Sequence, residues 1–151
     1  MNMQDIFQEN LNQAVRHLQI ADHIAYVTYP LINEKRLLIK ILEEIYLSII
    51  NCINAVLIYE KEDKENIGIF IKKYSKDYRL SNEHIKNILE ILETNQKHKE
   101  STMEFIKKEK LIILSNTSGI KTIDISVIKS YLLTAKELLL KINLKIKPNK
   151  N

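Results

Sequence analysis

Hydrophobic residues recur every three or four positions along most of the chain, which is the spacing of one face of an α-helix. The first such stretch runs from about Met3 to Thr28, and Pro30 is expected to end it because the residue before a proline avoids helical geometry. A second stretch, from about Glu34 to Glu60, follows an N-cap at Asn33. Apolar positions cover more than half of its circumference, so this helix lies at the centre of a bundle or buries one face against a partner.

Further helical patterns fill much of the remaining chain. A shorter helix is predicted over residues 67–78, and another begins at an Asn82 or Ser81 cap and ends near Lys99. The last helix begins at an Asp124 cap and leads into a basic tail, residues 147–151, which we expect to be disordered. Together these patterns predict one helical-bundle domain over residues 1–146.

The helical pattern is interrupted before the last helix. "KLIILS" (110–115) and "GIKTI" (119–123) are rich in β-branched and apolar residues and flank an Asn-Thr-Ser cluster, which favours a β-hairpin. "MEFI" (103–106) would add a third short strand, whereas the alternative is one continuous helix over 103–114. We therefore predict a mainly α fold, an antiparallel bundle of about five helices with a short β-hairpin before the C-terminal helix.

The composition excludes several kinds of functional site. The 151 residues include 2 glycines and 1 cysteine, Cys52, which excludes a glycine-rich phosphate loop, an intrachain disulfide and a cysteine-based zinc framework. The four histidines never stand four residues apart, so we expect no metal and no small-molecule cofactor. The uncharged segment 45–59 is shorter than the ~20 residues that span a bilayer, and the N-terminus lacks a signal-peptide pattern. We expect a cytoplasmic protein without a membrane partner.

Charge is distributed unevenly. Residues 1–60 carry a net charge of −3 and residues 61–151 a net charge of +7, so the C-terminal half can attract an anionic partner such as RNA. The candidate nucleic-acid-binding residues gather around the predicted hairpin: Lys97, Lys99, Lys107, Lys108, Lys110 and Lys121. The alternative is that these lysines protect an exposed strand edge from aggregation.

A polar seam is expected between the first two helices. Arg16, Gln19 and His23 lie along one stripe of the first helix, and an antiparallel second helix would bring polar residues of its own, Lys40, Glu44 and Ser48, opposite this stripe, with Ser48 opposite Arg16. In this pairing Glu44 and Lys40 face Gln19 and His23. An arginine, a histidine and a carboxylate within reach of one another can orient a phosphate and transfer a proton, which makes Arg16, His23 and Glu44 the candidate catalytic residues. The alternative is a satisfied structural network.

The segment "RHLQIADH" fits the pattern R-x6-H and resembles the motif of HEPN ribonucleases. These are small α-helical bundles, commonly dimeric, whose R-x4-6-H arginine and histidine are implicated in metal-independent RNA cleavage. The resemblance implies that Arg16 holds the phosphate and that His23 acts in proton transfer.

A second resemblance covers more of the chain. The segments "ADHIAYVTYPLINEKRLL", "INAVLIYE" and "HKESTMEFIKKEKLIIL" look like an uncharacterised group of small helical proteins from archaeal genomes. No activity is assigned to that group, so the resemblance implies a cytoplasmic helical protein and no mechanism.

Three functional hypotheses follow. The first is a non-catalytic helical binding module that meets a protein or an RNA-containing partner through its basic C-terminal half and forms a homodimer through the second helix. The second is a HEPN-type metal-independent endoribonuclease. The third is a purely structural subunit of a larger assembly. The absence of a specific catalytic motif favours a non-enzyme.

Overall fold

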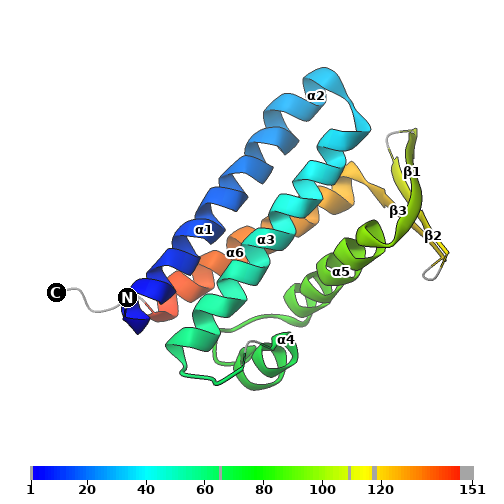
Figure 1. Cartoon of the computed structure of the whole chain (residues 1–151). Helices are drawn as coiled ribbons and strands as arrows, with labels where there is room; N and C mark the ends of the chain where they lie inside the picture. The colour runs from blue at the N-terminus through cyan, green and yellow to red at the C-terminus, as the bar shows by residue number, and fades with distance from the viewer. Residues whose placement is uncertain (1, 65, 109, 117–118, 147–151) are drawn as a thin grey trace.

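The computed structural model describes residues 2–64, 66–108, 110–116 and 119–146, and it is mainly helical with a small antiparallel sheet before the C-terminal helix (Figure 1). The elements in chain order are α1 (Met3–His23), η1 (Ile24–Thr28), α2 (Tyr29–Ile32), α3 (Lys35–Tyr59), α4 (Ile67–Ile69), η2 (Phe70–Tyr74), α5 (Asn82–Lys99), β1 (Ser101–Lys107), β2 (Lys110–Ser115), β3 (Gly119–Asp124) and α6 (Ile125–Ile146).

The first helix does not end before Pro30, so that prediction is wrong. The backbone continues through the π-helical turn η1 into α2, and Pro30 is the second residue of α2. The wider turn is closed by the Tyr29 N–H, which donates to the Ile24 carbonyl. Asn33 then ends α2 in the left-handed conformation, with φ 58°, instead of capping α3 as expected.

Helix α3 is the central element and confirms the second predicted helix within one residue at each end. It packs along α1, with α5 and α6 on its other sides (Figure 1). By length and composition this helix could cross a membrane, yet 61% of its most apolar window is buried inside the chain, as in the core helix of a globular protein. The apolar circumference that suggested a homodimer is therefore largely covered by the chain itself, and the dimer stays a prediction.

Between α3 and α5 the chain forms short helical pieces in place of the single helix predicted over 67–78. α4 and the π-helical turn η2 cover only residues 67–74, and Phe70 is fully buried there. Two tyrosine hydroxyls tie this segment to the end of α3: Tyr74 donates to Glu62, and Tyr78 donates to Glu60 at 2.9 Å. These bonds fix a segment whose own helical periodicity is too short to form a long helix.

Helix α5 begins and ends as predicted. The Ser81 hydroxyl accepts from the His84 N–H at 3.0 Å, and the His84 ring nitrogen Nδ1 accepts from the Ser81 N–H at 3.1 Å. This reciprocal pair is a capping box in which histidine replaces the usual glutamate. Ser81 is therefore the N-cap of α5, and Asn82 is the first residue of the helix.

The interruption is a three-stranded antiparallel sheet in the order β1-β2-β3, so the hairpin and the third strand are confirmed and the helix over 103–114 is wrong. Leu111, Ile113 and Ile123 are at most 1% exposed and pack toward the helices. At the end of β3 the Asp124 carboxylate accepts from the Val127 N–H at 2.9 Å, which confirms the predicted cap of α6. The tail predicted to be disordered, residues 147–151, lies outside the described residues.

Candidate functional site

A buried carboxylate lies in the seam between α1 and α3. The Glu44 side chain is 4% exposed; its Oε1 lies 2.6 Å from His17 Nδ1 and its Oε2 lies 2.7 Å from Lys40 Nζ. One turn further along α3, the buried Ser48 hydroxyl donates to the Ala14 carbonyl at 2.8 Å. The antiparallel pairing and the polar seam are therefore present as expected.

The side chains that α1 contributes to this seam differ from those predicted. His17, not His23, contacts Glu44, while Arg16 and His23 are both exposed. The buried stripe of α1 consists of Phe7, Leu11, Ala14, Leu18 and Ala21. At about 100° per residue, Arg16 and His23 lie on the opposite side of the helix from this stripe. The structure thus does not bring Arg16 and His23 together with Glu44.

The chemistry of Glu44 fits a structural tie between helices. Burial acts to raise the pKa of this carboxylate, but hydrogen bonds from Lys40 and His17 outweigh burial and hold the pKa below its usual value. Glu44 is therefore ionised at neutral pH with both oxygens occupied, and it offers no open position to a substrate. Catalytic roles for Arg16 and His23 stay predictions.

The six candidate lysines divide into two sets. Lys107, Lys108 and Lys110 are exposed at the β1–β2 turn, where Lys107 and Lys110 are cross-strand neighbours. The other three are engaged nearer to the helices, where Lys121 lies 3.5 Å from Glu93 and the Lys99 ammonium stacks over a tyrosine ring. Lys97 is half-buried near the end of α5. The first set is therefore the one whose lysines are exposed together at a single turn.

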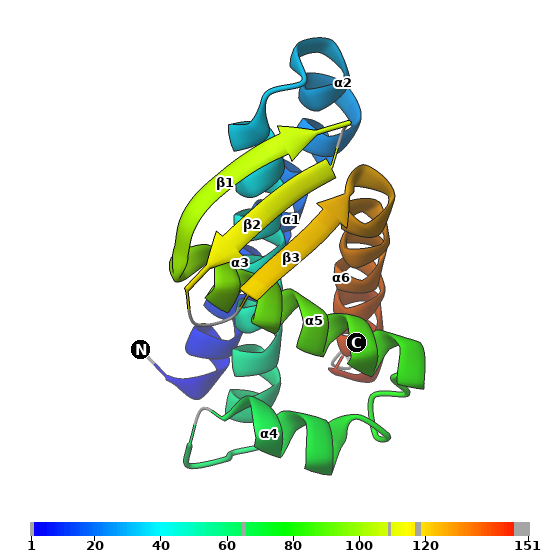
Figure 2. The same cartoon turned by 90° about the vertical axis from the view of Figure 1, so that its right-hand side faces the viewer.

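The outward face of the sheet carries a surface that the sequence reading did not identify. Alternation along the strands places Met103, Phe105, Ile112, Leu114 and Ile120 on the face opposite the buried one. We call these five residues the sheet face. Met103 is 58% exposed and Ile120 is 70% exposed. Figure 2 shows the sheet in front of the helices, with no described element lying over this face.

The register explains how the sheet face is built. Phe105 pairs with Ile112, and Leu114 lies between Met103 on one strand and Ile120 on the other. Apolar neighbours therefore form adjacent cross-strand rows, and the next row is the Lys107–Lys110 pair. The sequence does contain a sign of this surface: apolar residues occupy both the odd and the even positions of β2. A strand with one solvated face would instead alternate apolar and polar residues.

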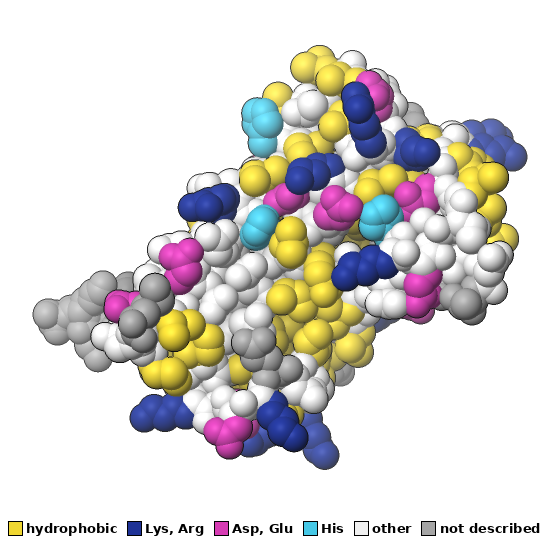
Figure 3. Space-filling view, viewed as in Figure 1, with side chains coloured by type: hydrophobic (Ala, Val, Ile, Leu, Met, Phe, Trp, Pro, Cys, Tyr) yellow, Lys and Arg dark blue, Asp and Glu magenta, His cyan; other side chains and the backbone are white. Residues whose placement is uncertain are grey.

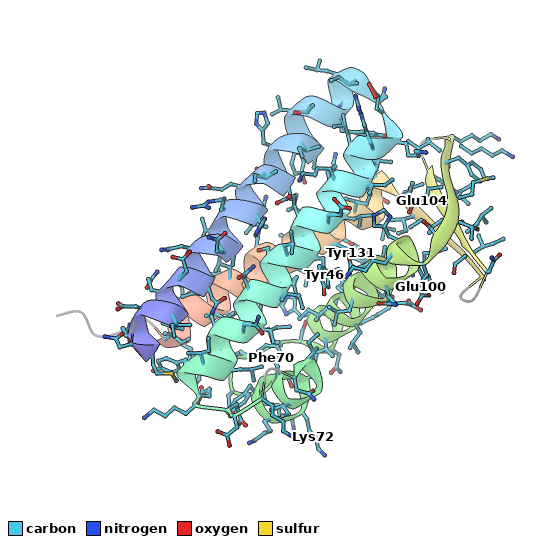
Figure 4. All side chains as sticks on the ribbon, viewed as in Figure 1. Tyr46, Phe70, Lys72, Glu100, Glu104 and Tyr131 are labelled. Carbon is cyan, nitrogen blue, oxygen red and sulfur yellow. The ribbon has the colours of Figure 1, made fainter. Side chains whose placement is uncertain are left out.

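A second histidine lies between two carboxylates. His98, at the end of α5, has Nδ1 2.5 Å from Glu104 of β1 and Nε2 3.0 Å from Glu43 of α3, and Figure 4 shows Glu104 on the side of β1 that faces α3. Burial acts to lower the pKa of His98, but the two carboxylates outweigh burial and raise it above its usual value. This contact joins the sheet to both helices, and Figure 3 shows histidine, acidic and basic side chains gathered in a band across this side of the molecule.

A hollow of about 440 Å³ lies at the far end of α6, lined by Asp77, Tyr78, Arg79, Lys141, Leu144 and Lys145. Two of its three cations, Lys141 and Lys145, already have contacts within the chain. The Lys141 ammonium donates to the Arg79 carbonyl at 2.9 Å, and the Lys145 ammonium lies over the Tyr78 ring. The hollow therefore has few cationic groups available for an anion.

Within the described ranges, no group of three or more histidine, cysteine, aspartate or glutamate side chains could hold a metal ion. No protein-family model, curated protein or solved structure matches the chain. The resemblances to HEPN ribonucleases and to the archaeal group therefore stay predictions.

Proposed function

We propose that the protein is a non-catalytic binding module, built on an antiparallel helical bundle, that engages a protein partner through the sheet face. The observation that carries this proposal is the apolar character of both faces of one small sheet. An antiparallel sheet with one solvated face normally alternates apolar and polar residues, so an apolar outward face is the expected feature of a surface that becomes covered.

The charges beside the sheet face describe the partner further. Lys107, Lys108 and Lys110 border one end of the apolar rows. A partner with an apolar patch and acidic residues along one edge would match both features. Opposite charges at the rim speed the encounter and fix orientation, while the apolar centre contributes most of the affinity.

The sheet face fits a protein better than RNA. Single-stranded RNA is held by several aromatic platforms along a basic groove, and Phe105 is the one aromatic residue among the five of the sheet face. Aliphatic side chains such as Ile120 contribute little to a polyanion but much to a protein interface. The RNA-containing partner is therefore the competing outcome of the test.

The two other hypotheses receive less support. A HEPN-type endoribonuclease would use Arg16 and His23, which lie exposed on the side of α1 away from its buried stripe and therefore away from Glu44. A purely structural subunit would keep the sheet face covered permanently. It would then form a complex that does not dissociate under native conditions.

The test is recovery of partners from the source cells with the wild-type protein and with matched variants. Met103→Lys places a charge on the sheet face at a side chain that is 58% exposed, and Leu140→Lys does the same on α6 at a side chain that is 57% exposed. We expect a protein that wild type and Leu140→Lys both retain, that Met103→Lys loses, and that nuclease treatment does not release.

Three results would contradict the proposal. Equal recovery by both variants would remove the sheet face as the binding surface. Loss with Leu140→Lys alone would move the site to α6, where Leu133 and Leu144 are also exposed. Release by nuclease would replace the protein partner with RNA.

A further inference from the structure

The end of the molecule formed by η1 and α2 is an exposed apolar tip. Leu31 is 81% exposed, Ile32 is 52%, Tyr26 is 51% and Val27 is 47%. We call these four residues the apex. The backbone that carries the apex forms the convex end of the α1–α3 pair (Figures 1 and 2), so these exposed side chains lie on a tip rather than in a groove.

The local fold maintains this exposure. Ala25 and Tyr29 point inward and are 0% and 4% exposed, so the residues between and after them must point outward. The π-helical turn η1 and the left-handed residue Asn33 fix the direction of the reversal. Polar side chains would serve equally well in a simple connection between helices, so large apolar residues at these positions require another explanation.

Basic residues surround the apex. Lys35 and Arg36 follow it at the start of α3, Lys107 and Lys108 come from the β1–β2 turn, and the Lys129 ammonium of α6 lies 4.7 Å from the centre of the Tyr26 ring. We call these five residues the basic collar.

The elements that carry the collar meet at one end of the molecule. Lys35 Nζ donates to the Glu104 carbonyl at 2.9 Å, which holds β1 beside α3. Figures 1 and 2 agree in placing α2, the β1–β2 turn and the start of α6 at this end. Among the described residues, the neighbouring acidic groups include Glu34, 3.2 Å from Arg36, and Asp124, the cross-strand neighbour of Lys110; in the sequence, Glu109 also follows Lys108. The five cations of the basic collar outnumber these three acidic residues.

We propose that this end of the protein docks on an anionic lipid surface, with the apex inserted at the headgroup–acyl boundary and the basic collar on the headgroups. A projecting aliphatic tip within a ring of cations matches a surface that is apolar below and negatively charged above. A nucleic acid would use the cations but gain little from Leu31. This is attachment to one leaflet, so the expectation of no membrane partner, which rested on the length needed to span a bilayer, does not address it.

The full chain is tested by co-sedimentation with vesicles of phosphatidylcholine alone and with vesicles that also contain phosphatidylserine. We expect binding to the phosphatidylserine vesicles only, weakening as salt is added. Leu31→Ser should weaken binding about tenfold or more, since the lost transfer energy of a leucine corresponds to at least that factor. Lys108→Gln should weaken it about fivefold.

Matched controls lie at the opposite end of the molecule. Leu144→Ser changes a leucine that is 68% exposed on α6, and Lys72→Gln changes a lysine that Figure 4 shows far from α2. Both controls should bind like the wild type. Met103→Lys should bind at least as tightly, which separates this proposal from the protein-binding function of the sheet face.

Each part of the experiment has a result that overturns the proposal. Failure of the wild type to bind phosphatidylserine vesicles overturns it outright. Unchanged binding by Leu31→Ser overturns insertion and leaves adsorption by charge alone. Binding of labelled RNA through Lys108 without vesicle binding assigns the basic collar to a nucleic acid. Since Leu31 is almost fully exposed, circular dichroism of Leu31→Ser should match the wild type, and loss of binding cannot then be attributed to unfolding.

Discussion

Replacing both hydrogen-bond partners of Glu44 tests whether the polar seam is a structural tie. In the double variant His17→Phe, Lys40→Met the carboxylate keeps its buried position, with a side chain that is 4% exposed in the wild type, but loses the groups that balance its charge. Breaking a buried ion pair by removing the partners costs about 3 to 5 kcal/mol. We expect the free energy of unfolding at neutral pH to fall by roughly that amount.

The pH dependence of stability gives the sharper result because it has opposite directions in the wild type and in the double variant. In the wild type the pKa of Glu44 lies below its usual value of 4.5, so the group stabilises the fold above that pH, and the contribution is lost as pH falls through the folded-state pKa. In the double variant only burial remains, and it raises the pKa. The variant therefore loses stability as pH rises above about 4.5.

The measurement is urea unfolding followed by circular dichroism at neutral pH and near pH 4, for the wild type, the double variant and Lys40→Met as a control that keeps His17. The urea midpoint of the double variant should fall by on the order of 2 M at neutral pH. The difference from wild type should shrink at acidic pH, whereas Lys40→Met should show a smaller loss. A difference that is the same at both pH values would refute the idea that an unpaired buried carboxylate causes the loss.

Three further predictions test other parts of the structure. His98 has a raised pKa, so its contribution to the free energy of unfolding is fully present below pH 6.5 and is lost as pH rises through the folded-state pKa. Chemical denaturation should therefore show His98→Gln to be less stable than the wild type below pH 6.5, with the difference shrinking at higher pH. A difference that is constant with pH would contradict this. Burial raises the pKa of the Cys52 thiol to about 12, so a thiol reagent should label it only after denaturant is added, and rapid labelling of the folded protein would show that α3 opens. Ser48→Ala should cost about 1 to 2 kcal/mol because the buried Ala14 carbonyl loses a donor, and an unchanged melting temperature would argue against that bond.

Local patterns were sufficient to predict the main elements. α3, α5, α6 and the strands lie where apolar spacing and caps indicate, because these signals act within a few residues of the chain. The errors occurred where a local rule has two outcomes. A proline such as Pro30 ends a helix in most settings, but here a π-helical turn precedes it and the helical backbone continues to Ile32. In the predicted helix over 67–78, η2 covers only Phe70–Tyr74, and the contacts of Tyr74 with Glu62 and of Tyr78 with Glu60 are made across the loop that follows α3.

The candidate site was predicted less well, for a geometric reason. The antiparallel pairing of α1 and α3 and the buried position of Glu44 followed from the pattern, but the facing histidine did not. The six residues between His17 and His23 make about 1.7 helical turns, about one-third of a turn short of two whole turns, which moves a side chain to another face. The rotation of α1 is set by its buried stripe, and the spacing of that stripe places Arg16 and His23 on the opposite side of the helix.

By itself the sequence determined the helical class, the place of the sheet, the excess of positive charge in the C-terminal half and the lack of an identifiable catalytic motif, since each depends on residue types and short spacings. Only the tertiary structure decided which faces remain outside. Strand alternation creates two faces for the sheet, and packing on α5 and α6 buries one of them and leaves Met103 and Ile120 in solvent. In the same way, the end of the α1–α3 pair becomes an exposed tip because no other described element reaches Leu31. Exposure is a property of what packs against a residue, and those neighbours come from distant parts of the chain.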